Sequence, residues 1–85
     1  MRTSDKVLEW AKDRGILENG TKYGQLSELY EQAGALGTSM MFDNLDGVMS
    51  DIGDLQIRLI IIAEMYGISA QDCLDNAFAD LVGDV

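Results

Sequence analysis

The sequence predicts an all-α protein, a single domain over residues 1–85 that folds as a bundle of about four helices. The chain contains no proline and only six aromatic residues among its 85. Leu, Ile, Ala, Met and acidic residues, which together favour helix over sheet, supply much of the composition. Several segments also repeat apolar residues at steps of three and four, the period of an amphipathic helix.

The first helix is expected over about residues 3–14, capped by Thr3 or Ser4 and ended by Gly15. Residues 16–21 predict a turn around Asn19 and Gly20.

Thr21 can cap a second helix that ends at Gly37, with an apolar stripe at Leu26, Leu29, Tyr30, Ala33 and Leu36. A loop over residues 38–44 then makes the next helix an antiparallel neighbour.

The third helix is expected over residues 45–66, ended by Gly67. Its core-facing stripe, the strongest periodic signal, comprises Leu45, Val48, Ile52, Leu55, Leu59 and Ile62. Its second half is apolar on other sides too, which favours cover from a partner subunit as well.

Ser69 and Asp72 resemble a capping box that opens a fourth helix. The stripe of that helix is Ala70, Cys73, Leu74, Ala77, Phe78 and Leu81. Cys73 has no second thiol or histidine beside it, so it is expected to be a small buried hydrophobic residue.

The charge is strongly acidic and uneven. The formal net charge is −9, and residues 23–85 carry eleven acidic side chains against the single basic Arg58. A phosphate backbone requires basic side chains, so direct nucleic-acid binding is not expected, whereas cations are natural partners. No segment is apolar for long enough to span a bilayer, and no leader peptide is apparent, which predicts a cytoplasmic protein, in the host cytoplasm if a phage encodes it. A 47% hydrophobic content in so short a chain predicts that the chain assembles with copies of itself into an oligomer.

Acidic side chains align on the second and third helices. Asp51, Asp54 and Arg58 share one line along the axis, and Glu28 and Glu31 share a strip with two uncharged positions. Carboxylates from facing helices could converge on Mg²⁺. Such spacings also arise on an ordinary solvated face, where Arg58 would simply pair with Asp54.

Five stretches resemble the small, phage-type branch of the MazG-like proteins: VLEWAKDRGILENGT, the QL pair at Gln25 and Leu26, LYEQAGAL, SDIGDLQIRLIIIAEMYGI and QDCLDNAFADL. The resemblance covers about residues 7–81. It implies an all-α nucleoside triphosphate pyrophosphohydrolase fold that assembles into dimers or tetramers. In that family an ExxE motif and an ExxD motif hold Mg²⁺, which activates the attacking water.

The resemblance places the second motif on Asp51 and Asp54 and the first on Gln32 and Ala35. The usual stretch resembles EEVGEL, and EQAGAL stands here, so one carboxylate is replaced by an amide and the other by a methyl group. Loss of two ligands predicts weak or absent hydrolysis. A relocated site would use Glu28 and Glu31, one turn earlier, opposite Asp51 and Asp54.

Three functions follow as hypotheses. The favoured one is a degenerate MazG-like module that binds a nucleotide or a host protein, with Gln32, Arg58 and Lys22 contacting the nucleotide. The second is an active Mg²⁺-dependent enzyme with the relocated site, for which the basic side chains are sparse. The third is an acidic mimic that occupies a basic site on a host protein. The sequence assigns no catalytic residue.

Overall fold

A computed structural model describes residues 2–83 and is all-helical over that range, with no strand. Met1, Asp84 and Val85, at the ends of the expected 1–85 domain, lie outside the described residues. The elements are α1 (Thr3–Asp13), α2 (Ile16–Asn19), α3 (Lys22–Met41), α4 (Leu45–Met65) and α5 (Ala70–Leu81).

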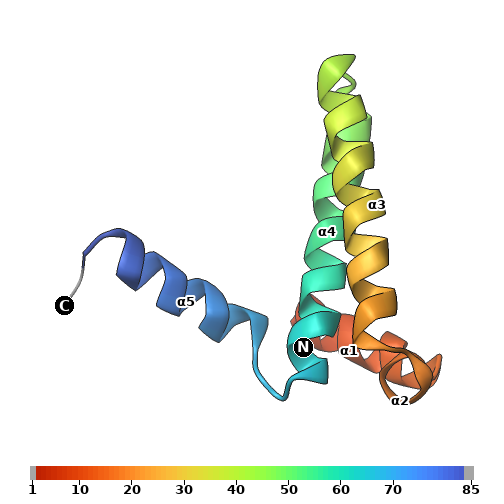
Figure 1. Ribbon diagram of the computed structural model, residues 1–85, viewed down its shortest axis with the longest axis vertical. Helices are drawn as coiled ribbons and strands as arrows, with labels where there is room; N and C mark the ends of the chain where they lie inside the picture. The colour runs from red at the N-terminus through yellow and green to blue at the C-terminus, as the bar shows by residue number, and fades with distance from the viewer. Residues whose placement is uncertain (1, 84–85) are drawn as a thin grey trace.

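The centre of the fold is a long antiparallel hairpin of α3 and α4 (Figure 1). The Thr21 side chain caps α3 by accepting from the Gly24 N–H at 2.9 Å, as the sequence predicts. Asn44 caps α4 in the same way, through the Gly47 N–H at 3.1 Å. Because α3 ends at Met41 and α4 begins at Leu45, residues equally far from Asp43 along the chain lie at about the same level of the hairpin.

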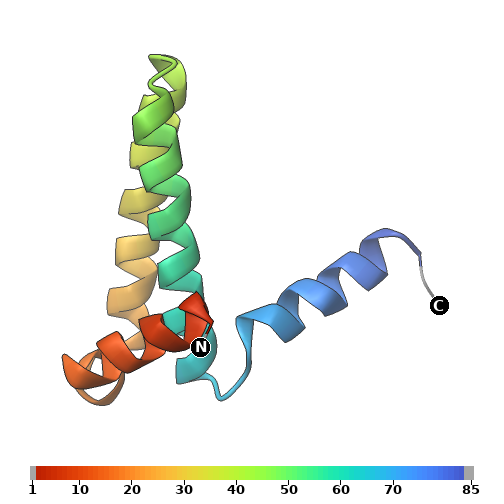
Figure 2. The ribbon, with the colours of Figure 1, turned by 180° about the vertical axis from the view of Figure 1, so that it is seen from behind.

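Helix α1 crosses the base of the hairpin and packs on α4 (Figure 2). Ala11 on α1 and Ile61 on α4 are completely buried. The apolar second half of α4 is thus covered by α3 on one side and by α1 on another, within one chain. Leu59 in this half of α4 is nevertheless 49% exposed, and assembly with a partner subunit stays a prediction.

Helix α5 projects away from the hairpin, and α4 is the only helix it contacts (Figures 1 and 2). Gly67, with a φ of 71° that suits glycine, follows the last turn of α4 as predicted. The Ser69 cap is confirmed, since its Oγ accepts from the Asp72 N–H at 3.2 Å. The prediction that Cys73 is buried is wrong: the residue is exposed, because within residues 2–83 no helix other than α4 contacts α5.

Three predicted helix boundaries were wrong. Residues 16–19 form one helical turn rather than an irregular turn. The N-cap position of α1 is Arg2, and neither Thr3 nor Ser4 caps the helix with its side chain. Helix α3 continues through Gly37 to Met41. A glycine inside a helix costs about 1 kcal/mol, which the last turn of α3 offsets by continued contact with α4.

The predicted core stripes of α3 and α4 are only partly buried. On α4, Leu45 is 70% exposed and Leu59 is 49% exposed. On α3, Tyr30 is 69% exposed, and the buried position is a polar one, Gln25. A hairpin of two helices can cover only the sides that face each other, so a stripe with core periodicity remains open to solvent. No helix between residues 2 and 83 is both long enough and apolar enough to cross a membrane.

Candidate functional site

The residues singled out by the MazG-like resemblance lie opposite one another in the hairpin. Gln32 and Asp54 are each eleven positions from Asp43, and Ala35 and Asp51 are each eight positions away. The amide and the methyl group therefore lie at the levels of the two aspartates. The register of α3 against α4 puts the two predicted motifs at the same levels of the hairpin. Only the motif on α4 carries carboxylates.

The two aspartates of α4 differ in their partners. Both are half-buried against the hairpin. The Ser39 hydroxyl, near the end of α3, lies 2.7 Å from Asp51 Oδ2 and donates to it. This bond occupies one oxygen of Asp51 and ties the last turn of α3 to α4.

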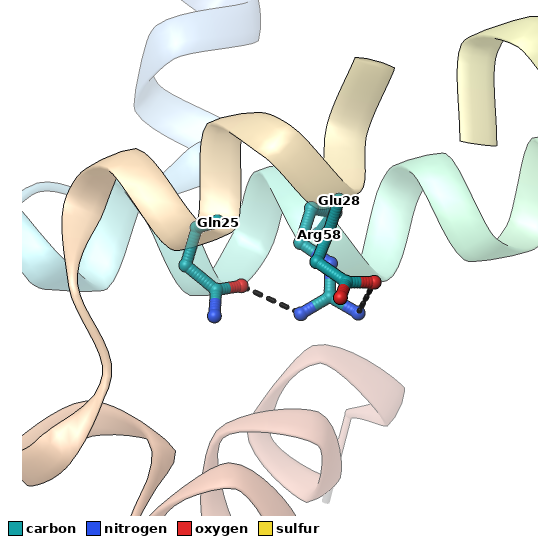
Figure 3. A network of polar contacts seen from close by, with 3 residues as sticks. All are labelled: Gln25, Glu28 and Arg58. Atoms are coloured by element: carbon teal, nitrogen blue, oxygen red, sulfur yellow. Dashed lines mark hydrogen bonds and ion pairs between the residues drawn. The ribbon is translucent and has the colours of Figure 1, made fainter. Parts of the chain in front are cut away.

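Arg58 lies at the centre of a polar network between the helices (Figure 3). Its Nη1 donates to the Oε1 of the buried Gln25 at 2.6 Å, and its Nη2 lies 4.0 Å from Glu28 Oε2. The Arg58 side chain is 15% exposed and the Glu28 side chain 53% exposed. The bond to Gln25 is the strong contact, whereas the ion pair is long and solvated. The predicted pairing of Arg58 with Asp54 is wrong, since Arg58 instead turns towards α3.

Two buried polar atoms in this region have no protein partner. One is the Nε of Arg58, a donor, and the other is the Oε1 of Gln32, an acceptor. Unpaired buried polar atoms cost free energy, so such groups usually contact water or a ligand. The polar side of the hairpin thus retains unused hydrogen-bonding capacity at Arg58 and Gln32.

The hairpin register bears directly on the relocated metal site. Moving one turn back along α3 corresponds to moving one turn forward along the antiparallel α4. Glu28 consequently lies level with Arg58, both fifteen positions from Asp43, and Glu31 lies level with Leu55. Glu28 therefore lies beside a guanidinium, and Glu31 is level with an apolar residue rather than with Asp51 or Asp54.

The carboxylates do not fit a magnesium ion in this chain. Across the described part of the sequence, no three acidic or other metal-binding side chains form a group that could hold a metal ion. Mg²⁺ requires several hard oxygen ligands in a tight octahedron. Glu28 already has a cation beside it, and Asp51 already accepts a hydrogen bond.

Two other basic residues, the predicted Lys22 and also Arg14, make contacts with aromatic rings. The Nζ of Lys22 lies 4.1 Å from the centroid of the Tyr66 ring, and the guanidinium of Arg14 lies 5.0 Å from the Trp10 ring. Each makes a cation–π contact. Arg58 is therefore the cation that the hairpin holds beside Gln32 and Glu28.

Gln25 and Ser39 each form a hydrogen bond with a polar residue of α4, Arg58 and Asp51 respectively, but were not among the predicted site residues. A signal for them exists in the sequence. Along α3 the positions 25, 28, 32, 35 and 39 recur at steps of three and four, as do the apolar positions. The line through them is the side that α3 turns towards the polar residues of α4.

The chain is similar to a protein of Haemophilus phage HP1 described as an uncharacterized 18.2 kDa protein in the rep-hol intergenic region. The identity is 28% over 64 residues, which cover 75% of this chain and 39% of the phage protein. The similar region thus spans about two fifths of that relative. No protein-family model and no solved structure matches the chain.

Proposed function

We propose that this chain is a degenerate MazG-like domain that binds a nucleotide on the polar side of the α3–α4 hairpin, with weak or no hydrolysis. The observation that carries the proposal is the position of Arg58, which is held by Gln25 and lies beside Glu28. A fixed guanidinium in this place favours anionic oxygens and opposes a divalent cation.

Weak hydrolysis follows from the side chains that stand at the metal-ligand positions. Pyrophosphohydrolysis in the family depends on Mg²⁺ held by carboxylates from two helices, and here Gln32 and Ala35 stand at the levels of Asp54 and Asp51. An amide oxygen and a methyl group cannot replace two anionic ligands of a hard cation. Loss of the metal removes both charge neutralisation and water activation.

Nucleotide binding is supported by the unused polar atoms. Both atoms are buried, so a nucleotide reaches them only after Glu28 moves away from Arg58. The Arg58 Nε can then donate to a phosphate oxygen, and the Gln32 Oε1 can accept from a base or sugar. Glu28 is half-exposed and its contact with Arg58 is long, so it can move aside at small cost.

Calorimetry with the common NTPs and dNTPs, with Mg²⁺ and with EDTA, tests the proposal. We expect binding that Arg58→Gln weakens at least tenfold and that Arg14→Gln, a matched loss of an exposed arginine, leaves unchanged. Absence of binding heat for every nucleotide would refute nucleotide recognition. A parallel assay of pyrophosphate release is expected to stay at background, and brisk Mg²⁺-dependent release would identify an active enzyme instead.

A further inference from the structure

Helix α5 is amphipathic, and its apolar stripe is open to solvent. Leu74, Phe78 and Leu81 follow one another at steps of four and three, and each is more than half exposed. The charged residues of the helix are all acidic, namely Asp72, Asp75 and Asp80. A helix with one apolar side gains stability chiefly by packing that side against another surface. The open stripe therefore needs a partner surface.

A shallow apolar hollow lies between α1 and α4, and we call it the Trp10 hollow. Its volume is about 250 Å³, and its lining residues are Thr3, Lys6, Val7 and Trp10 on α1 and Ile57 on α4. The four residues of α1 recur at steps of three and four, so they share one side of that helix. Trp10, the single tryptophan of the sequence, remains 44% exposed there. The hollow thus presents a large aromatic surface to solvent.

The connection between α4 and α5 has the length of a helical hairpin turn. Residues 66–69 join the two helices, within the range of about two to eight residues that usually joins helices in bundles. The N–H of Ile68 donates to the Ala63 carbonyl at 3.0 Å, and the N–H of Gly67 to the Glu64 carbonyl at 2.9 Å. These bonds close α4 as a Schellman motif. The backbone dihedral angles that direct α5 therefore lie at Ile68 and Ser69, and rotation there turns α5 without unwinding either helix.

Folding α5 back along α4 would bring its stripe to the level of the Trp10 hollow. Ile57 lies eight positions before Met65, where α4 ends, and Phe78 lies eight positions after Ala70, where α5 begins. In an antiparallel pair these two residues are level. Phe78 is 59% exposed in the open position and is the aromatic side chain of α5. It would then meet Ile57 and Trp10, an aromatic contact that favours this register.

The charges beside the two surfaces are opposite in sign. Lys6 is the charged residue that lines the hollow, and the Arg14 guanidinium lies 5.0 Å from the centroid of the Trp10 ring. Helix α5 carries acidic side chains and no basic one. The short connection also holds α5 at a high effective concentration beside the hollow. A second copy would have no such advantage and would bring a further charge of −9.

We propose that α5 is a hinged arm that closes on its own chain, with Phe78 seated in the Trp10 hollow. The position in Figures 1 and 2 is the open state, and the closed state buries the stripe together with Trp10. The arm uses neither Arg58 nor Gln32, so its closure is independent of the proposed nucleotide site. Any apolar partner of the hollow must compete with α5.

Acrylamide quenching of Trp10 fluorescence in the full chain tests the closure. We expect Phe78→Ala to raise the quenching constant about twofold, because loss of the apolar side chain shifts the arm to the open state. Asn76→Ala, a truncation on the other side of α5, should leave the constant unchanged. Circular dichroism of both variants confirms that the helices are retained. Equal constants for Phe78→Ala and the unaltered chain would overturn the proposal.

Energy transfer separates closure on the same chain from contact with a second copy. Asn76→Cys in a Cys73→Ala background carries a dansyl acceptor, and Trp10 is the donor. We expect acceptor emission that falls in Phe78→Ala but persists when the labelled chain is mixed with a large excess of unlabelled Trp10→Phe chain. Loss of emission in this mixture would mean that α5 packs on another copy. Either that loss or the lack of an effect of Phe78→Ala would exclude the hinged arm.

Discussion

At the scale of single residues, the least expected feature is a buried amide on the side of α3 that faces α4. Gln25 is 8% exposed, and its side-chain oxygen accepts from Arg58. A buried amide is tolerated only when it is hydrogen-bonded, and here the partner comes from a residue 33 positions away in the sequence. The pair fixes the direction of the Arg58 side chain and hence the chemistry of the polar side of the hairpin.

This pair leads to a stability prediction. Arg58→Met leaves the Gln25 oxygen buried without a donor and should lower the free energy of unfolding by about 1–3 kcal/mol. Glu28→Gln removes only a long, half-exposed ion pair and should cost less than about 1 kcal/mol. Urea unfolding followed by circular dichroism measures both. Equal losses for the two variants would show that the Gln25 bond contributes no more than the surface pair.

A second prediction concerns the two altered ligand positions. Gln32→Glu combined with Ala35→Glu places carboxylates at the levels of Asp54 and Asp51. We expect Mn²⁺ and Mg²⁺ to bind at least tenfold more tightly, because four anionic donors then face one another across the hairpin. Without metal the same variant should melt at a lower temperature, since the like charges repel.

The control for this variant adds the same two charges elsewhere on α3. Gly34→Glu with Thr38→Glu is suitable, since a Cβ at Gly34 meets open space and Thr38 is exposed. Calorimetric titration should show no gain in metal affinity for the control. If both double variants gained equally, the effect would be general charge attraction rather than a site between the helices.

At the scale of elements, local capping explains where the hairpin helices begin. Thr21 and Asn44 each satisfy an N–H of the first turn, and both stand immediately before their helices. The turn between α3 and α4 is tight, and Asp43 adopts a positive φ of 49°, which an aspartate tolerates better than most residues. This short connection makes the two helices antiparallel and sets their register.

The Asn44 cap gives a prediction at this scale. Asn44→Ala removes the acceptor for the Gly47 N–H and should destabilise the chain by about 1 kcal/mol, whereas Asn44→Ser should retain most of the stability. Thermal unfolding at fixed protein concentration measures the difference. An alanine variant as stable as the serine variant would mean that the hairpin turn is held by its tertiary contacts alone.

At the scale of the whole molecule, the fold has a thin core and a large open surface. Within residues 2–83 the buried apolar residues are Ala11, Ile61 and Ala63. Two helices crossed by a third cannot enclose a continuous interior. The stripe of α4 through Leu45, Ile52 and Leu59 therefore remains open to solvent.

Net charge gives a prediction for the self-association that the sequence predicts. Each copy carries a formal charge of −9, so two copies repel over a distance set by salt. The Debye length falls from about 10 Å at 0.1 M to about 3 Å at 1 M. The dimer dissociation constant should therefore fall as NaCl rises over this range, as measured by sedimentation. Weaker association at higher salt would point to an interface held by opposite charges.

The sequence by itself determined the helical class, the antiparallel pairing of α3 and α4, the helix caps at Thr21 and Ser69, and the start of α4 at Leu45. These features depend on short-range physics: apolar period, side-chain caps and glycine at positive φ. Its weakest inference was burial. The stripe through Leu45, Ile52 and Leu59 has the period of a core, but periodicity only shows that a helix has an apolar side.

The tertiary structure decided which sides are covered and which residues meet. It placed α1 on the second half of α4, left α5 and the stripe through Leu45, Ile52 and Leu59 open to solvent, and set Glu28 opposite Arg58 rather than opposite an aspartate. That last outcome follows from antiparallel register, in which one turn back on α3 is one turn forward on α4. The sequence predicts the loop over residues 38–44 and therefore misses this pairing, because α3 continues to Met41 and the turn is centred on Asp43.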